Sequence, residues 1–149
     1  MMRSLRAAMA AHIIIEEALE ALDENALKAQ LPLSGCGAVV SFLGITRGTE
    51  GDAEVIRLEF DAWQEQLSSV LHGLAEEAIE VHTVRCVAMA HRVGSVGPEE
   101  PIVAIHVGSP HRKEAFRACE WLIDELKKQA PLWKKEVTNK GESWKAGLG

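Results

Sequence analysis

Cysteine is scarce in this chain, and its positions exclude the sites that paired cysteines usually form. The 149 residues include three cysteines, Cys36, Cys86 and Cys119, which lie far apart among apolar neighbours. An odd number at such spacing fits neither a disulfide framework nor a C-x-x-C metal site. We therefore expect buried free thiols in a protein of a reducing compartment.

Long hydrophobic runs are also absent. The longest apolar stretch, residues 35–45, is far shorter than the roughly 20 residues that a membrane-spanning helix needs. Arg3 and Arg6 precede small and apolar residues, as in a signal peptide, but Glu16 and Glu17 appear before any convincing cleavage site. We therefore expect a cytoplasmic protein without a membrane partner.

The sequence lacks the short motifs of several large function classes. It contains no G-x-S-x-G, no G-x-x-x-x-G-K-[ST] and no G-x-G-x-x-G, which argues against the common hydrolases, P-loop proteins and dinucleotide-binding enzymes. The histidines, among them His91 and His106, follow no metal-ligand spacing, so no metal site is predicted. A wide, arginine-rich basic face is missing too, which argues against a nucleic-acid partner.

The composition itself is that of a globular protein. Hydrophobic residues make up 47% of the chain and charged residues 26%, which is close to the average for soluble domains. A chain of this length buries a substantial core. We therefore predict a single domain over residues 1–149, in which residues 1–11 could form a flexible extension.

The charge is unevenly distributed along the chain. The formal net charge is −6, but residues 127–149 hold six lysines and two glutamates, a local charge of +4. Two lysine pairs, 127–128 and 134–135, flank the helix-ending Pro131, with Trp133 between them. Lysines at a helix C-terminus favour the helix dipole, so this cluster is either a solvated helix end or an anion site.

Hydrophobic periodicity predicts an alternation of strands and helices in the order β α β β α β β α, followed by a basic C-terminal segment. This order favours an α+β domain with three main helices and a mixed or largely antiparallel sheet. The last two strands are expected to form a hairpin. The predicted strands are 12–15, 37–44, 55–60, 83–94 and 101–108, and the predicted helices are 16–31, 62–80 and 110–130.

Two strand predictions specify which side chains are buried. Residues 37–44 are mostly apolar, which is typical of a central strand buried on both faces. Residues 55–60 alternate between apolar and charged side chains, which indicates a half-buried strand. Its buried face would carry Ile56, Leu58 and Phe60.

Capping residues mark the predicted helix ends. Asp61 and Gln64 have the spacing of a capping box at the start of the second helix. Ser109 and Pro110 suit the N-cap and first position of the last helix, and Pro131 would end it.

His111 and Arg112 fall in the first turn of that last helix. They are either exposed polar side chains or part of an anion site, because unpaired N–H groups at a helix start attract anions. Lys127 lies roughly 24 Å further along a straight helix. A site that joins all three would need either the segment carrying Lys134 to fold back or a neighbouring subunit.

Four segments together resemble the large, catalytic subunit of molybdopterin synthase. The similarity covers nearly the whole chain from about His12, and its most specific part is the pattern L-K-x-x-x-P-x-W-K-x-E. The segments are GAVVSFLGITRG, AHRVGSVGPEEPIVAIHVGSPHRKEAF, IDELKKQAPLWKKE and GESW.

The resemblance implies a fold, a reaction and a partner. The fold is an α/β hammerhead, and the reaction converts cyclic pyranopterin monophosphate (precursor Z) into molybdopterin by adding two dithiolene sulfurs. A small ubiquitin-like subunit donates the sulfur as a thiocarboxylate on its C-terminal Gly-Gly tail. Two large subunits would form a central dimer within a heterotetramer, and this subunit would need no metal or cofactor.

The resemblance also implies the site residues. Lys127 and Lys134 match the two catalytic lysines of the family, and Arg47, His111 and Arg112 match its pterin and phosphate site. Some family members have lysine where Ile45 stands, so only backbone contacts are expected from that position. The remaining implied pocket residues are Ile45, Thr46, Lys135 and Glu136.

Two other function classes stay open beside the enzyme. One is a non-catalytic module that binds a ubiquitin-like Gly-Gly tail, and the other is an unrelated enzyme with a Schiff-base lysine, which borohydride would trap. A docking module has no need of Lys127, Arg47 and His111 together, so their joint presence favours the enzyme.

Overall fold

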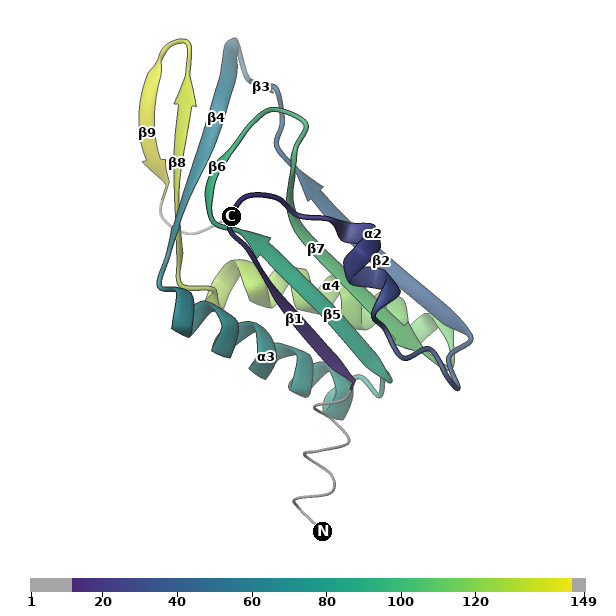
Figure 1. Cartoon of the computed structure of the whole chain (residues 1–149). Coiled ribbons are helices and arrows are strands. Elements are labelled where there is room, and N and C mark those ends of the chain that lie inside the picture. Colours follow the sequence, from purple (N-terminus) through teal and green to yellow (C-terminus); the bar gives the residue numbers. More distant parts are fainter. Residues whose placement is uncertain (1–11, 146–149) are drawn as a thin grey trace.

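Two β-sheets and three helices form the part of the chain that the computed structural model describes, residues 12–145 (Figure 1). The predicted extension at residues 1–11 lies outside this range. The predicted α+β class, with a mixed sheet, is confirmed. The helices are α2 (Glu24–Ala29), α3 (Gln64–Val81) and α4 (Arg112–Gln129). The strands are β1 (Ile13–Ala18), β2 (Ala38–Ile45), β3 (Thr49–Glu50), β4 (Ala53–Ala62), β5 (Cys86–Arg92), β6 (Gly94–Val96), β7 (Pro101–Ser109), β8 (Leu132–Thr138) and β9 (Gly141–Lys145).

The first sheet has the strand order β1-β5-β7-β2. β1 runs parallel to β5, and the other pairs are antiparallel, so the predicted hairpin of the last two strands is confirmed as β5 and β7. α3 and α4 pack on one face, where Val87 and Met89 of β5 join the main core. α2 packs on the other face over the small residues Ala88 and Ala90, because alternate strand residues point to opposite faces.

The second sheet has the order β3-β4-β8-β9, with β6 also pairing to β4 (Figure 1). Residues 132–145 of the basic C-terminal segment therefore form a hairpin, β8–β9. α4 ends where predicted, with Ala130 as its C-cap and Pro131 next, and β8 then returns along β4. No helix within residues 12–145 is both long and apolar enough to span a bilayer.

The first predicted helix, residues 16–31, is mostly wrong. β1 continues to Ala18, because Glu16 pairs with Ala90 of β5 and the strand ladder overrides a helical spacing of apolar residues. The helix is limited to Glu24–Ala29, where Asp23 caps it by accepting the N–H of Ala26.

The burial predicted for two strands is also corrected. β2 is an edge strand and not a central one, so Val39 and Leu43 are 39% and 40% exposed. Ile56 is 50% exposed, and Val55 is buried in its place beside Leu58 and Phe60. The cause is a register shift between Val55 and Arg57 against β8, which interrupts the alternation.

Two predicted helix caps are wrong. Asp61 still belongs to β4, and Trp63 is the N-cap of α3 with no side-chain cap hydrogen bond. Ser109 is the buried last residue of β7, and His111 is the N-cap of α4. Longer strand pairing moved both helix starts toward the C-terminus.

Candidate functional site

One cavity contains both lysines of the predicted catalytic pair. It has a volume of about 220 Å³ and lies among β2, β4, β5, β7, α4 and β8. We call it the lysine cavity. Apart from Lys127 and Lys134 its walls are mostly apolar, and they comprise Phe42, Gly44, Ile45, Leu58, Phe60, His91, Ile102, Val103, Ile123 and Leu126.

The chain reversal after α4 brings the two lysines together. Lys127 lies in the last turn of α4 and is exposed, whereas Lys134 lies in β8 and is partly buried. Pro131 prevents α4 from continuing, and β8 then pairs with β4 so that Lys134 stands opposite Phe60. The segment carrying Lys134 thus folds back, and it brings Lys134 to Lys127 but not to His111.

The surroundings of Lys134 lower the affinity of its side chain for a proton. Burial lowers the pKa of Lys134 below 10.5, and the nearby charges of Lys145 and Arg47 lower it further. The carboxylates of Glu136 and Glu50 partly oppose this shift. Glu136 is itself only 9% exposed and lies two residues along β8. An ammonium with reduced solvation and few partners attracts an entering anion strongly.

His91 also lines the lysine cavity, and it is absent from the predicted site. The side chain is 3% exposed, and its Nδ1 lies 2.7 Å from the carbonyl oxygen of Arg92. A carbonyl oxygen only accepts, so Nδ1 is the protonated nitrogen and donates. Burial lowers the pKa of His91 to about 4, so the ring is neutral at pH 7. Its place at the end of a strand was the only sequence signal.

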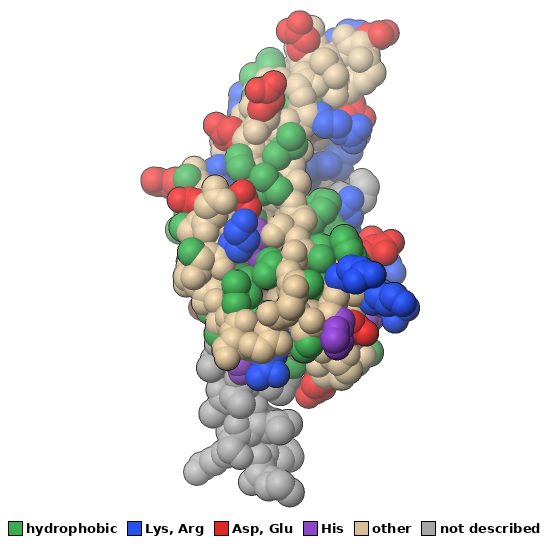
Figure 2. Space-filling view, turned by 90° about the vertical axis from the view of Figure 1, so that its right-hand side faces the viewer, with side chains coloured by type: hydrophobic (Ala, Val, Ile, Leu, Met, Phe, Trp, Pro, Cys, Tyr) green, Lys and Arg blue, Asp and Glu red, His purple; other side chains and the backbone are tan. Residues whose placement is uncertain are grey.

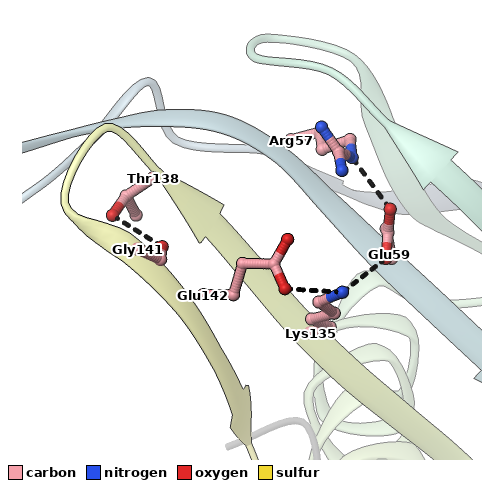
Figure 3. A network of polar contacts seen from close by, with 6 residues as sticks. All are labelled: Arg57, Glu59, Lys135, Thr138, Gly141 and Glu142. Carbon is pink, nitrogen blue, oxygen red and sulfur yellow. Dashed lines mark hydrogen bonds and ion pairs between the residues drawn. The ribbon is translucent and has the colours of Figure 1, made fainter.

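Lys135 points away from the lysine cavity. Its Nζ lies 2.9 Å from Oε2 of Glu142 and 3.6 Å from Oε2 of Glu59 (Figure 3). The other carboxylate oxygen of Glu59, Oε1, accepts a hydrogen bond from Nε of Arg57 at 2.8 Å. The Nζ also lies 5.8 Å from the ring centroid of Trp144. Neighbouring strand residues face opposite sides, so Lys134 and Lys135 cannot both line the cavity.

The loop after β2 holds Thr46 firmly and leaves Arg47 exposed. Thr46 is 1% exposed, donates its N–H to the carbonyl of Glu100 at 3.0 Å and accepts the N–H of Glu99 at 2.8 Å. The Arg47 side chain is 82% exposed and lies 4.0 Å from Glu50. Arg47 is therefore available to a ligand, and its charge acts on Lys134.

His111 and Arg112 lie at the other end of α4. They line an open hollow of about 490 Å³, together with Lys113 and Glu114 from the same helix turn. The intervening helix is continuous, so roughly 24 Å separate His111 from Lys127 at 1.5 Å per residue. The fold of one protomer therefore assembles Lys127 and Lys134 but does not bring His111 and Arg112 to them.

Comparison with known proteins places this arrangement in a family. The family model described as MoaE protein matches residues 15–129. The molybdopterin synthase catalytic subunit of Cereibacter sphaeroides is 39% identical over 113 residues, which cover 76% of this chain and 76% of that one.

Two solved structures share the fold. A structure of molybdopterin synthase from Staphylococcus aureus matches with a TM-score of 0.83 and 30% identity, covering 88% of this chain and 96% of that one. A complex of subunits 1 and 2 of the molybdopterin-converting factor from Helicobacter pylori matches with a TM-score of 0.72 and 24% identity, covering 87% and 88%. The fold and family that the sequence segments implied are confirmed, and this chain belongs to the MoaE family.

Proposed function

We propose that this protein is the catalytic subunit of a molybdopterin synthase, which converts cyclic pyranopterin monophosphate into molybdopterin. The observation that carries the proposal is the convergence of Lys127 and Lys134, from different elements, on one narrow cavity. By the resemblance, these two residues match the catalytic lysines of the family. If Lys127 were only a solvated residue at a helix end, it would not be expected to line a cavity together with Lys134.

The residues of the lysine cavity suit a sulfur transfer from a thiocarboxylate. For each sulfur, a carbon–sulfur bond must form on the pterin side chain as a carbon–oxygen bond there breaks, and water must then cleave the acyl–sulfur bond to leave a carboxylate on the donor. Negative charge develops in both steps, and a lysine ammonium in a partly dry site stabilises it. Lys127 would meet the donor and assist the transfer, and Lys134 would steady the substrate and the transient acyl or phosphate anion.

The donor would be the Gly-Gly tail of a small ubiquitin-like subunit. The cavity, at about 220 Å³, is smaller than the roughly 300–1,000 Å³ of most small-molecule sites, so it suits a narrow occupant. Glycine has no side chain, and an extended Gly-Gly end can therefore enter between apolar walls. The free cysteines agree with the reducing cytoplasm that the sequence predicts as the location.

A second copy of the chain would complete the pterin site. His111 and Arg112 are too far from Lys127 within one protomer, but a homodimer within the heterotetramer can juxtapose opposite ends of two α4 helices. The edge strand β2 exposes the apolar side chains of Val39, Leu43 and Ile45, and Figure 2 shows hydrophobic side chains on this side of the molecule. Ile45 also lines the lysine cavity, which lies next to this surface.

A single-turnover assay tests the proposed function. Purified protein is mixed with cyclic pyranopterin monophosphate and a thiocarboxylated small subunit, and molybdopterin is measured as its fluorescent oxidation product. Product should form, and Lys127→Ala should lower the rate by about 100-fold or more. Lys128→Ala is the matched control, because Lys128 is exposed, pairs with Glu125 and does not line the cavity.

Two outcomes would replace the proposal. Tight binding of the small subunit without product, at a large excess of both reactants, would indicate a non-catalytic docking module. Borohydride trapping of the substrate on Lys127 or Lys134 would indicate a Schiff-base enzyme instead.

A further inference from the structure

His91 gives the lysine cavity a neutral hydrogen-bond acceptor beside its two cations. Its Nδ1 is committed to the carbonyl of Arg92, so the only nitrogen left for a ligand is Nε2. In this tautomer Nε2 has a lone pair and no hydrogen, and it can only accept. An occupant that uses all three side chains must therefore combine an anionic group with an N–H or O–H donor.

The position of His91 is fixed by its packing. Its ring meets the ring of Phe60 edge-on, with centroids 5.1 Å apart and planes at 79°. Phe60 in turn stands opposite Lys134 in the β4–β8 ladder. His91 and Lys134 therefore flank the same aromatic side chain, and both reach the cavity. A buried ring held in this way offers its lone pair in one direction.

The groups around His91 keep that lone pair available. Arg92, the adjacent cation, points elsewhere, since its Nε donates to the carbonyl of Ala18 and one terminal nitrogen to that of Ser95. The titratable groups that share the lysine cavity with His91 are Lys127 and Lys134, whereas Glu16 and Glu17 line a second, smaller hollow that His91 also borders. Burial disfavours the imidazolium.

We propose that His91 Nε2 accepts a hydrogen bond from the peptide N–H of the last glycine of the donor tail, while Lys127 and Lys134 hold its terminal anion. This inference rests on the proposed function. The end of a Gly-Gly tail has the required chemistry, because the N–H of its last residue lies next to the terminal carboxylate or thiocarboxylate. The contact fixes the plane of the last peptide group and so orients the reactive carbon.

Two substitutions separate the cavity-facing nitrogen from the structural one. His91→Asn keeps a donor near the position of Nδ1 for the Arg92 carbonyl and removes the acceptor. His91→Gln places an amide oxygen near the position of Nε2 and gives up the bond to Arg92. Thermal unfolding of both variants first establishes that they are folded.

The tail is varied in parallel. A small subunit with a carboxylate-terminated Gly-Gly tail is compared with one whose last peptide bond is an ester, which lacks the N–H. Affinities for the native protein and both variants are measured by calorimetry without pterin, so that pterin N–H groups cannot contribute. The ester should weaken binding to the native protein about 5- to 10-fold, as expected for one hydrogen bond.

The double-substitution comparison decides the proposal. His91→Asn should weaken binding of the amide tail by about the same factor as the ester weakens binding to the native protein. In His91→Asn, the ester tail and the amide tail should then bind equally well. His91→Gln should keep most of the native preference for the amide tail. An equal ester penalty in the native protein and in His91→Asn would overturn the role of His91. Failure of the native protein to bind either tail would instead contradict the proposed function.

Discussion

Lys134 stands directly opposite Phe60 in the antiparallel pairing of β4 with β8. Phe60 is buried and contacts His91, so this one pairing places Lys134 on the inner side of the sheet. The next residue, Lys135, consequently faces outward to Glu59 and Glu142. The strand register thus divides two adjacent lysines into one that lines the cavity and one that belongs to a surface ion-pair network.

Replacing Lys134 should stabilise the fold and impair the reaction. Burial lowers the pKa of Lys134, which means that folding removes favourable solvation from its ammonium. Lys134→Met should therefore raise the free energy of unfolding by about 1 kcal/mol, while activity falls about 100-fold or more. Urea denaturation and the single-turnover assay measure the two effects.

The pH dependence of that stability has a definite sign. Between the lowered pKa of folded Lys134 and 10.5, the unfolded chain binds more protons, so native stability should rise with pH there and Lys134→Met should lack this rise. Lys135→Met is the control, because it loses ion pairs to Glu59 and Glu142 and should not stabilise the fold. A Lys134→Met protein less stable than the native one would contradict the burial argument.

Acid should destabilise the native protein partly through His91. The ordinary pKa of histidine is 6.5, and burial lowers that of His91 to about 4. Above pH 6.5 the group is neutral in both states. Between these values mainly the unfolded chain is protonated, so native stability decreases as the pH is lowered from 6.5 to 4. The loss from this group should reach about 3 kcal/mol near pH 4. As the pH is lowered, the urea midpoint of His91→Asn should fall less steeply than that of the native protein. Parallel curves for the two proteins would refute this.

The buried thiols should resist alkylation in the folded protein. Burial raises the pKa of Cys86 to about 12, where the charge of nearby Cys36 adds to the effect, and that of Cys119 to about 11. The thiolate is the reactive form, so little of it exists at pH 8. Iodoacetamide followed by mass spectrometry should label the partly exposed Cys36 first, and all three after unfolding. Rapid labelling of Cys86 in the folded protein would be the contrary result.

A side chain at Gly108 should destabilise the sheet. A Cβ there would lie 2.5 Å from Sγ of Cys86 and 3.2 Å from Sγ of Cys36, inside the packing between β7 and its neighbours. Gly108→Ala should therefore cost about 1–3 kcal/mol of unfolding free energy. Gly73→Ala is the matched control, because nothing lies within 4 Å of a Cβ in that exposed turn of α3. Gly73→Ala should stabilise the helix by about 0.5–1 kcal/mol. Equal changes in unfolding free energy for the two variants would contradict the packing argument.

Mixing two inactive variants should restore activity if the site is shared between copies. Lys127→Ala and His111→Ala damage opposite ends of α4, and in a mixed dimer both lesions fall in one of the two sites. Random exchange of subunits at equal amounts should then recover about a quarter of native activity, because half of the dimers are mixed and each has one intact site. No recovery after proven subunit exchange would place both residues in a site of one protomer.

Local sequence rules succeeded where one residue type decides the outcome. Pro131 ends α4 because proline cannot continue a helix, and the β5–β7 hairpin follows from two apolar runs around a short turn. They failed at residues 16–18, where the helical spacing of apolar residues competes with pairing to β5. Such pairing depends on a strand some 70 residues away, which no local pattern contains.

The sequence by itself determined the family and which two lysines match the catalytic pair of that family, because the pattern around Pro131 is specific and contiguous. Only the tertiary structure decided that Lys134 and not Lys135 lines the cavity and that His91 joins it. A strand pattern defines two faces, but the register with β4 selects the inner one. The rigid length of α4 likewise separates residues that the family resemblance assigns to one site.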